Sequence, residues 1–293
     1  MTHKQKAGAA VDSADRPDDD RRKPKGTTPM ADRPKPKRIL AICQQKGGTG
    51  KTTTAAAIGA GLARRGERVL FIDLDPQSNL SYSIPTAGEV TATAFEFLTD
   101  SNRPNAIYPL DDRTGIRQFA QIMPSSQKLA GADNIITQTG KEYRLKERLD
   151  SLTQLWDYII IDTPPGLGIL TINALTAADG VIIPCQADVF SIQATGQIAE
   201  TIRTVKKYCN PGLTIEGILL TRFNARQILT RETAETLERA AGHLGTRLFK
   251  ARIRETLAIR EAQAQQKNIF DYSPEGNGAR DYNALIEELT ANE

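Results

Sequence analysis

The sequence predicts an α/β protein with a doubly wound, mostly parallel sheet that is flanked by helices. Short apolar runs alternate with longer helical segments, a glycine-rich loop follows the first run, and two later runs end directly at an aspartate. Uninterrupted apolar runs are typical of parallel strands that are covered on both faces. Their alternation with helices therefore favours one sheet between two helical layers.

The expected strands are short apolar runs, and they comprise residues 38–44, 68–72, 158–161, 181–184 and 213–221. The expected helices are alanine-rich or carry apolar residues at helical spacing, and they comprise residues 52–65, 92–98, 141–152, 192–208, 230–244 and 278–289. Gly66 is placed to end the first helix, as glycine commonly does just beyond a helix. Residues 101–135 show no clear pattern.

The first 37 residues differ in composition from the rest of the chain. They are rich in Lys, Arg, Asp, Pro, Gly and Ala and hold almost no large apolar side chain, so burial cannot offset their loss of entropy on ordering. Residues 1–38 hold 11 Lys/Arg and 6 Asp, a net charge of +5, which leaves 27 basic and 29 acidic residues of the total 38 and 35, a net of −2, for residues 39–293. We expect residues 1–37 to be a disordered basic tail and residues 38–293 to form one domain. The tail is either a solubilising extension or an arm that contacts DNA or a partner.

The composition argues against several classes of protein. No apolar stretch approaches the ~20 residues of a membrane span, and the N-terminus has no hydrophobic signal region. Cys43, Cys185 and Cys209 are widely spaced, which suits a reducing cytoplasm and not a disulfide framework. With no C-x-x-C pair and only two histidines, a zinc or iron–sulfur site is not expected.

The loop after the first apolar run has the composition of a phosphate-binding loop. Its residues are Lys46, Gly47, Gly48, Thr49, Gly50, Lys51, Thr52 and Thr53. Glycines allow backbone N–H groups to surround phosphate oxygens, Lys51 adds a positive charge, and Thr52 offers a hydroxyl to Mg²⁺. Gln45 stands where the usual motif has its first glycine, and Lys46 is an additional lysine. Because the loop joins a strand to a helix, it predicts the P-loop NTPase fold and a nucleotide site.

Carboxylates follow two other apolar runs. Asp73 and Asp75 come after the second expected strand, and Asp162 ends the run 159–161 just before two prolines. Ligands of open α/β sheets bind at this edge, so the carboxylates belong beside the phosphate loop. Of Asp73 and Asp75, one can hold a metal-bound water and the other can orient an attacking water, while Asp162 fits the second Mg²⁺-holding element of P-loop NTPases.

In these motifs the chain resembles the ParA/MinD family of ATPases with a deviant phosphate loop, and within it the plasmid and chromosome partition ATPases (ParA, Soj). The resemblance covers about residues 38–290 and rests on the loop 46–53 and on the segments 73–79, 161–165 and 217–226. It identifies residues 38–293 as a deviant Walker A ATPase domain that uses ATP and Mg²⁺.

The resemblance also implies residue roles. Lys46 would reach the phosphates of a partner subunit, so that ATP forms part of a homodimer interface, and Lys51 would serve the ATP of its own subunit. Asp75 would position the attacking water, and Thr52, Asp73 and Asp162 would serve the metal. Arg222 and Asn224 would lie near the nucleotide base, as would the segment 254–261.

The resemblance further implies a nucleoid-associated cytoplasmic protein that binds DNA without sequence preference and is stimulated by a ParB-like partner. Arg226, Arg254 and Arg260 are the candidate DNA-binding residues in a basic last third of the chain. Ala258 stands where the family has a second DNA-binding arginine, which puts the strength of DNA binding in doubt.

Other functions of the same ATPase switch remain open. The switch could position a protein cargo, such as a carboxysome or chemoreceptor cluster, over the nucleoid. A MinD-like membrane role is disfavoured because residues 282–293 are acidic, and anionic lipid would repel them. An iron protein of nitrogenase type lacks its cluster cysteines here, and 37 residues are too few for an operator-reading domain.

Overall fold

The computed structural model describes residues 35–291 apart from 101, 103 and 225–227, and the predicted tail lies almost wholly outside this range. Within it, one eight-stranded sheet has the order β3-β4-β2-β5-β1-β6-β7-β8. Among the named strands of the described residues, β3 and β4 form the one antiparallel pair. The strands are β1 (Arg38–Ile42), β2 (Val69–Asp73), β3 (Tyr108–Pro109), β4 (Ala120–Met123), β5 (Tyr158–Asp162), β6 (Gly180–Gln186), β7 (Thr214–Phe223) and β8 (Leu248–Arg254). The predicted fold class is confirmed.

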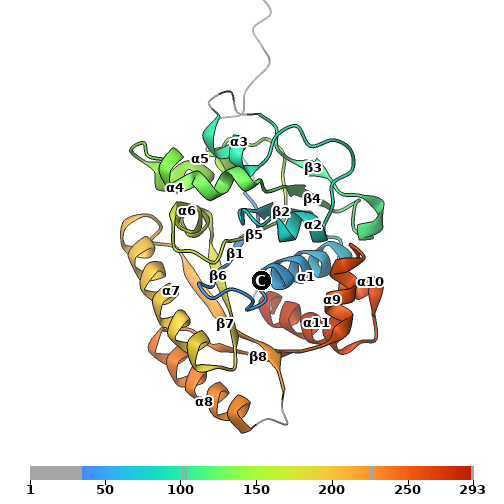
Figure 1. Cartoon of the computed structure of the whole chain (residues 1–293), viewed down its shortest axis with the longest axis vertical. Helices are drawn as coiled ribbons and strands as arrows, with labels where there is room; N and C mark the ends of the chain where they lie inside the picture. Colours follow the sequence, from blue (N-terminus) through green and yellow to red (C-terminus); the bar gives the residue numbers. More distant parts are fainter. Residues whose placement is uncertain (1–34, 101, 103, 225–227, 292–293) are drawn as a thin grey trace, which may run out of the picture. The chain divides into compact units, whose positions relative to one another are not determined.

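Helices cover both faces of the sheet (Figure 1). The helices on one face are α1 (Lys51–Arg64), α2 (Asn79–Ser83), α9 (Leu257–Ala264), α10 (Ile269–Tyr272) and α11 (Asn277–Thr290). Those on the other face are α3 (Ala94–Thr99), α4 (Ala132–Ile135), α5 (Arg144–Asp150), α6 (Ile169–Ala177), α7 (Val189–Tyr208) and α8 (Ile228–His243).

The side chains of β1 and of Cys43, which follows it, contribute to the core on both faces of the sheet. Leu40 and Ile42 pack with the α1 side, whereas Ala41 and Cys43 pack with the α6 side. Successive side chains of a strand point to opposite faces of the sheet, so a strand with helices on both faces must be apolar throughout. This is the physical reason that the apolar runs located the central strands.

The helix α1 lies close to both β2 and α11 because two of its residues have no side chain. A Cβ atom at Gly59 would overlap the ring of Phe71, and one at Gly61 would overlap Ile286. These contacts hold the C-terminal half of α1 against β2 and α11, and the N-terminus of the same helix borders the phosphate loop. Gly66 follows the helix with a φ angle of +88°, as its predicted role in ending the helix requires.

Several elements differ from the sequence-based expectation, and the helices α2, α6, α9 and α10 were not predicted. Residues 141–143 form a 3₁₀ turn before α5, so the expected helix over 141–152 is shorter. The edge strand β8 was not predicted, because Lys250 and Arg252 alternate with the buried residues Phe249, Ala251 and Ile253. This alternating pattern was interpreted as a basic surface cluster, although period-two alternation is typical of a half-exposed strand.

Substitution of Gly59 by alanine should destabilise the protein. The added methyl group must displace Phe71, and overpacking of this kind costs about 1–3 kcal/mol, more than the gain of about 1 kcal/mol in helix propensity. Gly196→Ala is the matched control, because this exposed glycine of α7 has open space around it and its replacement should stabilise the helix. Urea unfolding measures both, and a Gly59→Ala variant as stable as Gly196→Ala would contradict the packing argument.

Candidate nucleotide site

The phosphate loop occupies residues 44–50, between the end of β1 and the start of α1. Gly48 and Gly50 have φ angles of +74° and +91°, a left-handed conformation that costs other residues about 1 kcal/mol or more. These two glycines bend the loop over the N-terminus of α1. The free N–H groups at this end of a helix and the helix dipole together favour an anion such as phosphate.

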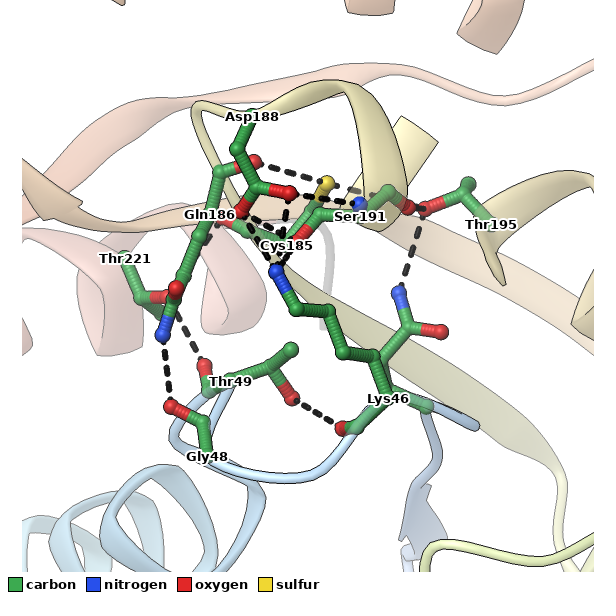
Figure 2. A network of polar contacts seen from close by, with 10 residues as sticks. Lys46, Gly48, Thr49, Cys185, Gln186, Asp188, Ser191, Thr195 and Thr221 are labelled. Carbon is green, nitrogen blue, oxygen red and sulfur yellow. Dashed lines mark hydrogen bonds and ion pairs between the residues drawn. The ribbon is translucent and has the colours of Figure 1, made fainter. Parts of the chain in front are cut away.

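Side chains from neighbouring strands hold the carbonyl groups of the loop (Figure 2). Gln186, at the end of β6, donates from Nε2 to the Gly48 carbonyl at 2.6 Å, and Thr221 of β7 donates from Oγ1 to the Thr49 carbonyl at 2.7 Å. Thr49 itself donates to the Lys46 carbonyl at 3.3 Å. With its carbonyl groups engaged by the protein, the loop keeps its N–H groups for a ligand.

Sequence reasoning did not identify Gln186 or Thr221 as residues that hold the loop. Each residue lies at or near the carboxyl end of an apolar strand. A polar residue at such a position is too common to indicate contact with a loop more than 130 residues away in sequence. Only the pairing of β6 with both β1 and β7 brings these strand ends to the loop.

Lys51 lies under the loop at the first position of α1 and is 6% exposed. Burial lowers the pKa of its ammonium group, and the carboxylates of Asp162 and Asp75 act in the opposite direction. The lysine is therefore held among negative charges in a site with little water. This environment suits a charge that neutralises phosphate.

Thr52 and Asp162 are joined by a hydrogen bond of 2.7 Å from Thr52 Oγ1 to Asp162 Oδ2. Asp162 is fully buried, and its Oδ1 has no hydrogen-bond partner among the described residues. Burial raises the pKa of Asp162 well above its usual value, and the neighbouring Asp73 raises it further. A buried carboxylate oxygen without a partner, next to a hydroxyl group, fits the hard oxygen ligands of Mg²⁺, directly or through water.

Asp73 lies next to Asp162 in the sheet, but its carboxylate has different hydrogen-bond partners. Its Oδ2 accepts hydrogen bonds from the N–H and hydroxyl groups of Ser81 at 2.8 and 2.7 Å, and its Oδ1 accepts one from the N–H of Asp75 at 3.1 Å. Burial raises the pKa of Asp73 to about 6, against the lowering effect of these bonds. The carboxylate thus holds the loop that follows β2 in place. Its role as a metal ligand remains a prediction, and the engagement of both its oxygens within the protein does not favour that role.

Asp75 lies in the wall of the nucleotide cavity and is 6% exposed. Its Oδ1 accepts from the N–H of Gln77 at 3.0 Å, and its carbonyl accepts from the hydroxyl of Ser125 at 2.5 Å. The backbone is therefore fixed from both sides while the carboxylate borders the cavity. The turn after β2 thus gives Asp73 and Asp75 different hydrogen-bond partners.

The cavity in front of the loop has a volume of about 370 Å³, which lies in the range of small-molecule sites. Its walls include Gly48, Lys51, Asp75, Arg222, Thr256 and Arg260. Arg222 has a left-handed φ angle of +49°, which is uncommon for a residue with a side chain and marks the sharp turn after β7. Asn224 is exposed two residues further on.

The three residues predicted to bind DNA have different surroundings. Arg254 lines the cavity, and its Nε donates to both carboxylate oxygens of Asp281 at 3.1 and 3.0 Å, so its charge is already paired within the protein. Arg260 is exposed at the cavity rim on α9. Arg226 lies outside the described residues. Their contact with DNA remains a prediction.

The glycine-rich loop, the buried lysine and the Thr52–Asp162 pair define a P-loop nucleoside triphosphatase site. A family model described as an AAA domain matches residues 37–215. The sporulation initiation inhibitor protein Soj of Bacillus subtilis is 37% identical over 257 residues, 87% of this chain and 99% of Soj. The chromosome partitioning protein ParA of Myxococcus xanthus is 37% identical over 254 residues, 86% of this chain and 87% of that protein. The chain belongs to the ParA/Soj family of partition ATPases.

Solved structures of related proteins share the fold. McdA of Cyanothece in a complex with ATP has a TM-score of 0.76 at 26% identity, over 87% of this chain and 96% of McdA. Cobyrinic acid a,c-diamide synthase of Mycobacterium smegmatis with an ATP analogue and magnesium has a TM-score of 0.72 at 31% identity, over 87% and 96% of the two chains. Among the described residues of this chain, no helix has the length and apolar character needed to cross a membrane.

Replacement of Thr221 by valine should weaken nucleotide binding. Valine keeps the side-chain shape but leaves the buried Thr49 carbonyl without its donor, at a cost of about 1 kcal/mol or more, or about fivefold in affinity. Calorimetric titration with Mg·ADP measures the effect. Thr221→Ser keeps the hydroxyl group and is the control, and equal affinities of the valine and serine variants would contradict the anchoring role.

Proposed function

We propose that this protein is an ATPase that dimerises when it binds ATP, binds DNA without sequence preference as a dimer, and partitions a plasmid or chromosome with a ParB-like partner. The observation that carries the proposal is the presence of two lysines in one phosphate loop with different surroundings. Lys51 is 6% exposed beneath the loop, whereas the Lys46 side chain is 30% exposed. In this proposal Lys51 serves the nucleotide of its own subunit, and Lys46 reaches the phosphates bound by a second subunit.

In the proposed hydrolysis, a water molecule attacks the terminal phosphorus of ATP, the bond from that phosphorus to its bridging oxygen breaks, and ADP and inorganic phosphate leave. The loop N–H groups and Lys51 bind the phosphates, and Asp75 orients the water that attacks the terminal phosphorus. Thr52 and Asp162 would hold Mg²⁺, directly or through water, and the ion would neutralise charge that develops on the phosphate oxygens. A related structure with an ATP analogue and magnesium and another with ATP support this choice of ligands.

The character of the C-terminal helix α11 favours DNA, and not a membrane, as the surface to which the dimer binds. A membrane-binding helix must present an apolar face, but in α11 the apolar residues Tyr282, Leu285, Ile286 and Leu289 are buried in the protein core. Glu287 and Glu288 lie on the same helix and would be repelled by anionic lipid. Phosphate contacts from exposed arginines such as Arg260 give the sequence-independent binding that the proposal requires.

A DNA shift assay distinguishes these surfaces. Unrelated DNA fragments should be shifted in the presence of Mg²⁺ and a slowly hydrolysed ATP analogue and not with ADP, and the shift should weaken steeply as salt increases. Vesicles of anionic lipid, tested in the same nucleotide states, should not bind. ATP-dependent vesicle binding without a DNA shift would overturn the proposed DNA function.

Lys46→Ala should abolish ATP-dependent dimerisation and leave nucleotide binding by the monomer within about threefold of wild type. The reason is that Lys46 lies outside the buried part of the phosphate site, and its charge is needed only when two sets of phosphates meet. Sedimentation velocity with the ATP analogue gives the mass, and a titration with labelled nucleotide gives the affinity. Normal dimers of this variant would exclude the role across the interface.

Asp75→Ala should bind ATP, form dimers and remain on DNA, because the water is no longer oriented and hydrolysis slows by about 10²-fold or more. Phosphate release and DNA retention measure the effect. Lys51→Ala provides the control that fails at the earlier step of nucleotide binding. Turnover by Asp75→Ala at the wild-type rate would rule out Asp75 as the hydrolytic carboxylate.

A further inference from the structure

The ammonium group of Lys46 is bound within its own subunit. Its Nζ lies 2.8 and 2.7 Å from the two carboxylate oxygens of Asp188 and 3.2 Å from Ser191 Oγ (Figure 2). The ring centroid of Phe190 lies 6.0 Å away, and this side chain is 73% exposed. Lys46, which the proposed function assigns to the phosphates of a partner subunit, therefore has its ammonium group engaged by Asp188 and Ser191 of its own subunit.

Asp188 is held in position to receive the lysine. It is the N-cap of α7, where its Oδ1 accepts from the N–H of Ser191 at 2.9 Å and its Oδ2 accepts from the Ser191 hydroxyl at 2.8 Å. Both oxygens are thus oriented by the start of a helix before the lysine arrives. The pairing is built into the fold and does not depend on two flexible side chains meeting by chance.

The segment that carries Asp188 also contacts the phosphate loop a second time. Gln186 donates to the Gly48 carbonyl, two residues along the loop from Lys46. The two contacts fix the distance between the start of α7 and the loop, so Asp188 stays within reach of Lys46 in the single subunit.

We propose that Asp188 is a positioning residue that keeps Lys46 inside its own subunit and thereby sets how readily ATP produces a dimer. One ammonium group cannot stay paired with Asp188 and also insert between the phosphates of a second subunit. Each dimer must break two Lys46–Asp188 pairs, so the pair opposes dimerisation in proportion to its strength. This inference rests on the proposed role of Lys46 in a partner's site.

The exposure of the pair gives the size of the effect. The side chains of Lys46 and Asp188 are 30% and 31% exposed, so solvent screens their attraction. Pairs of this kind change an equilibrium by a factor of about 1.4 to 5, and two per dimer give a factor of about 2 to 25. A contact of this strength raises the threshold for dimerisation without preventing it.

The test is Asp188→Asn, which removes the charge but keeps an oxygen that caps α7. Asp157→Asn is the matched control, because Asp157 likewise pairs with a cation, Arg68, and accepts from a backbone N–H at 2.8 Å, away from the phosphate loop. Sedimentation velocity with Mg²⁺ and the slowly hydrolysed ATP analogue should show a dimer constant about 2- to 25-fold tighter in Asp188→Asn and unchanged in Asp157→Asn. An unchanged or weaker dimer of Asp188→Asn overturns the inference, and a weaker one assigns Asp188 to the dimer contact itself.

Chemical labelling of the nucleotide-free monomer gives a second readout that a purely structural capping role would not change. Acetic anhydride should modify Lys46 faster in Asp188→Asn than in the wild type, measured by mass spectrometry, with Lys128 as internal reference. Equal rates overturn the inference. Asp188→Ser, which also keeps a capping oxygen, serves if the asparagine variant does not fold.

The outcome for Lys46→Ala separates the two proposals. If that variant forms normal ATP dimers, the proposed function of Lys46 fails. If it stays monomeric while Asp188→Asn gains no dimer affinity, only the inference about Asp188 fails.

Discussion

The balance of buried charge at the ends of β1, β2 and β5 governs the rest of the site. Ile42, Asp162 and Asp73 lie side by side in the register of these strands, so two carboxylates meet just where the phosphate loop begins. Lys51 is the cation placed among them, and burial, together with the neighbouring carboxylates, raises the pKa of both aspartates. Burying like charges together is costly, and Mg²⁺ relieves that cost when it arrives with a nucleotide. The site is therefore arranged for a metal–phosphate pair and not for phosphate alone.

The two lysines of the loop illustrate how burial separates the functions of similar residues. Lys51 is fixed beneath the loop by the start of α1 and faces carboxylates that do not move away. Lys46 has a half-exposed partner on a different element and a long flexible side chain, so its pairing can be exchanged. A lysine is suited to such exchange because its ammonium group is a compact charge on a flexible stem. The same residue type thus provides a permanent charge at one position and a transferable one at the other.

The sequence predicted the central strands, the phosphate loop and the position of Asp162 beside that loop because each depends on local order: apolar runs and the residues directly after them. It could not predict that Ser81 would engage Asp73, that Asp281 would engage Arg254, or that Asp188 would engage Lys46. These pairs join residues whose meeting depends on the path of loops and on helix placement, and a single charged residue in sequence gives no sign of its partner. The edge strand β8 was missed because its polar side chains were counted as surface charge.

Linkage shows why a weak pair on Lys46 matters to an ATP-driven switch. If ATP promotes dimerisation, dimerisation must increase ATP affinity by the same factor, so the coupling free energy is shared between the two events. If Lys46 leaves Asp188 only when it reaches the phosphates of a partner subunit, the pair is broken in the ATP dimer, and its strength subtracts from the stability that the phosphates add. Under the proposed function, the phosphates would therefore favour the ATP dimer, and the Lys46–Asp188 pair would set how readily ATP produces it.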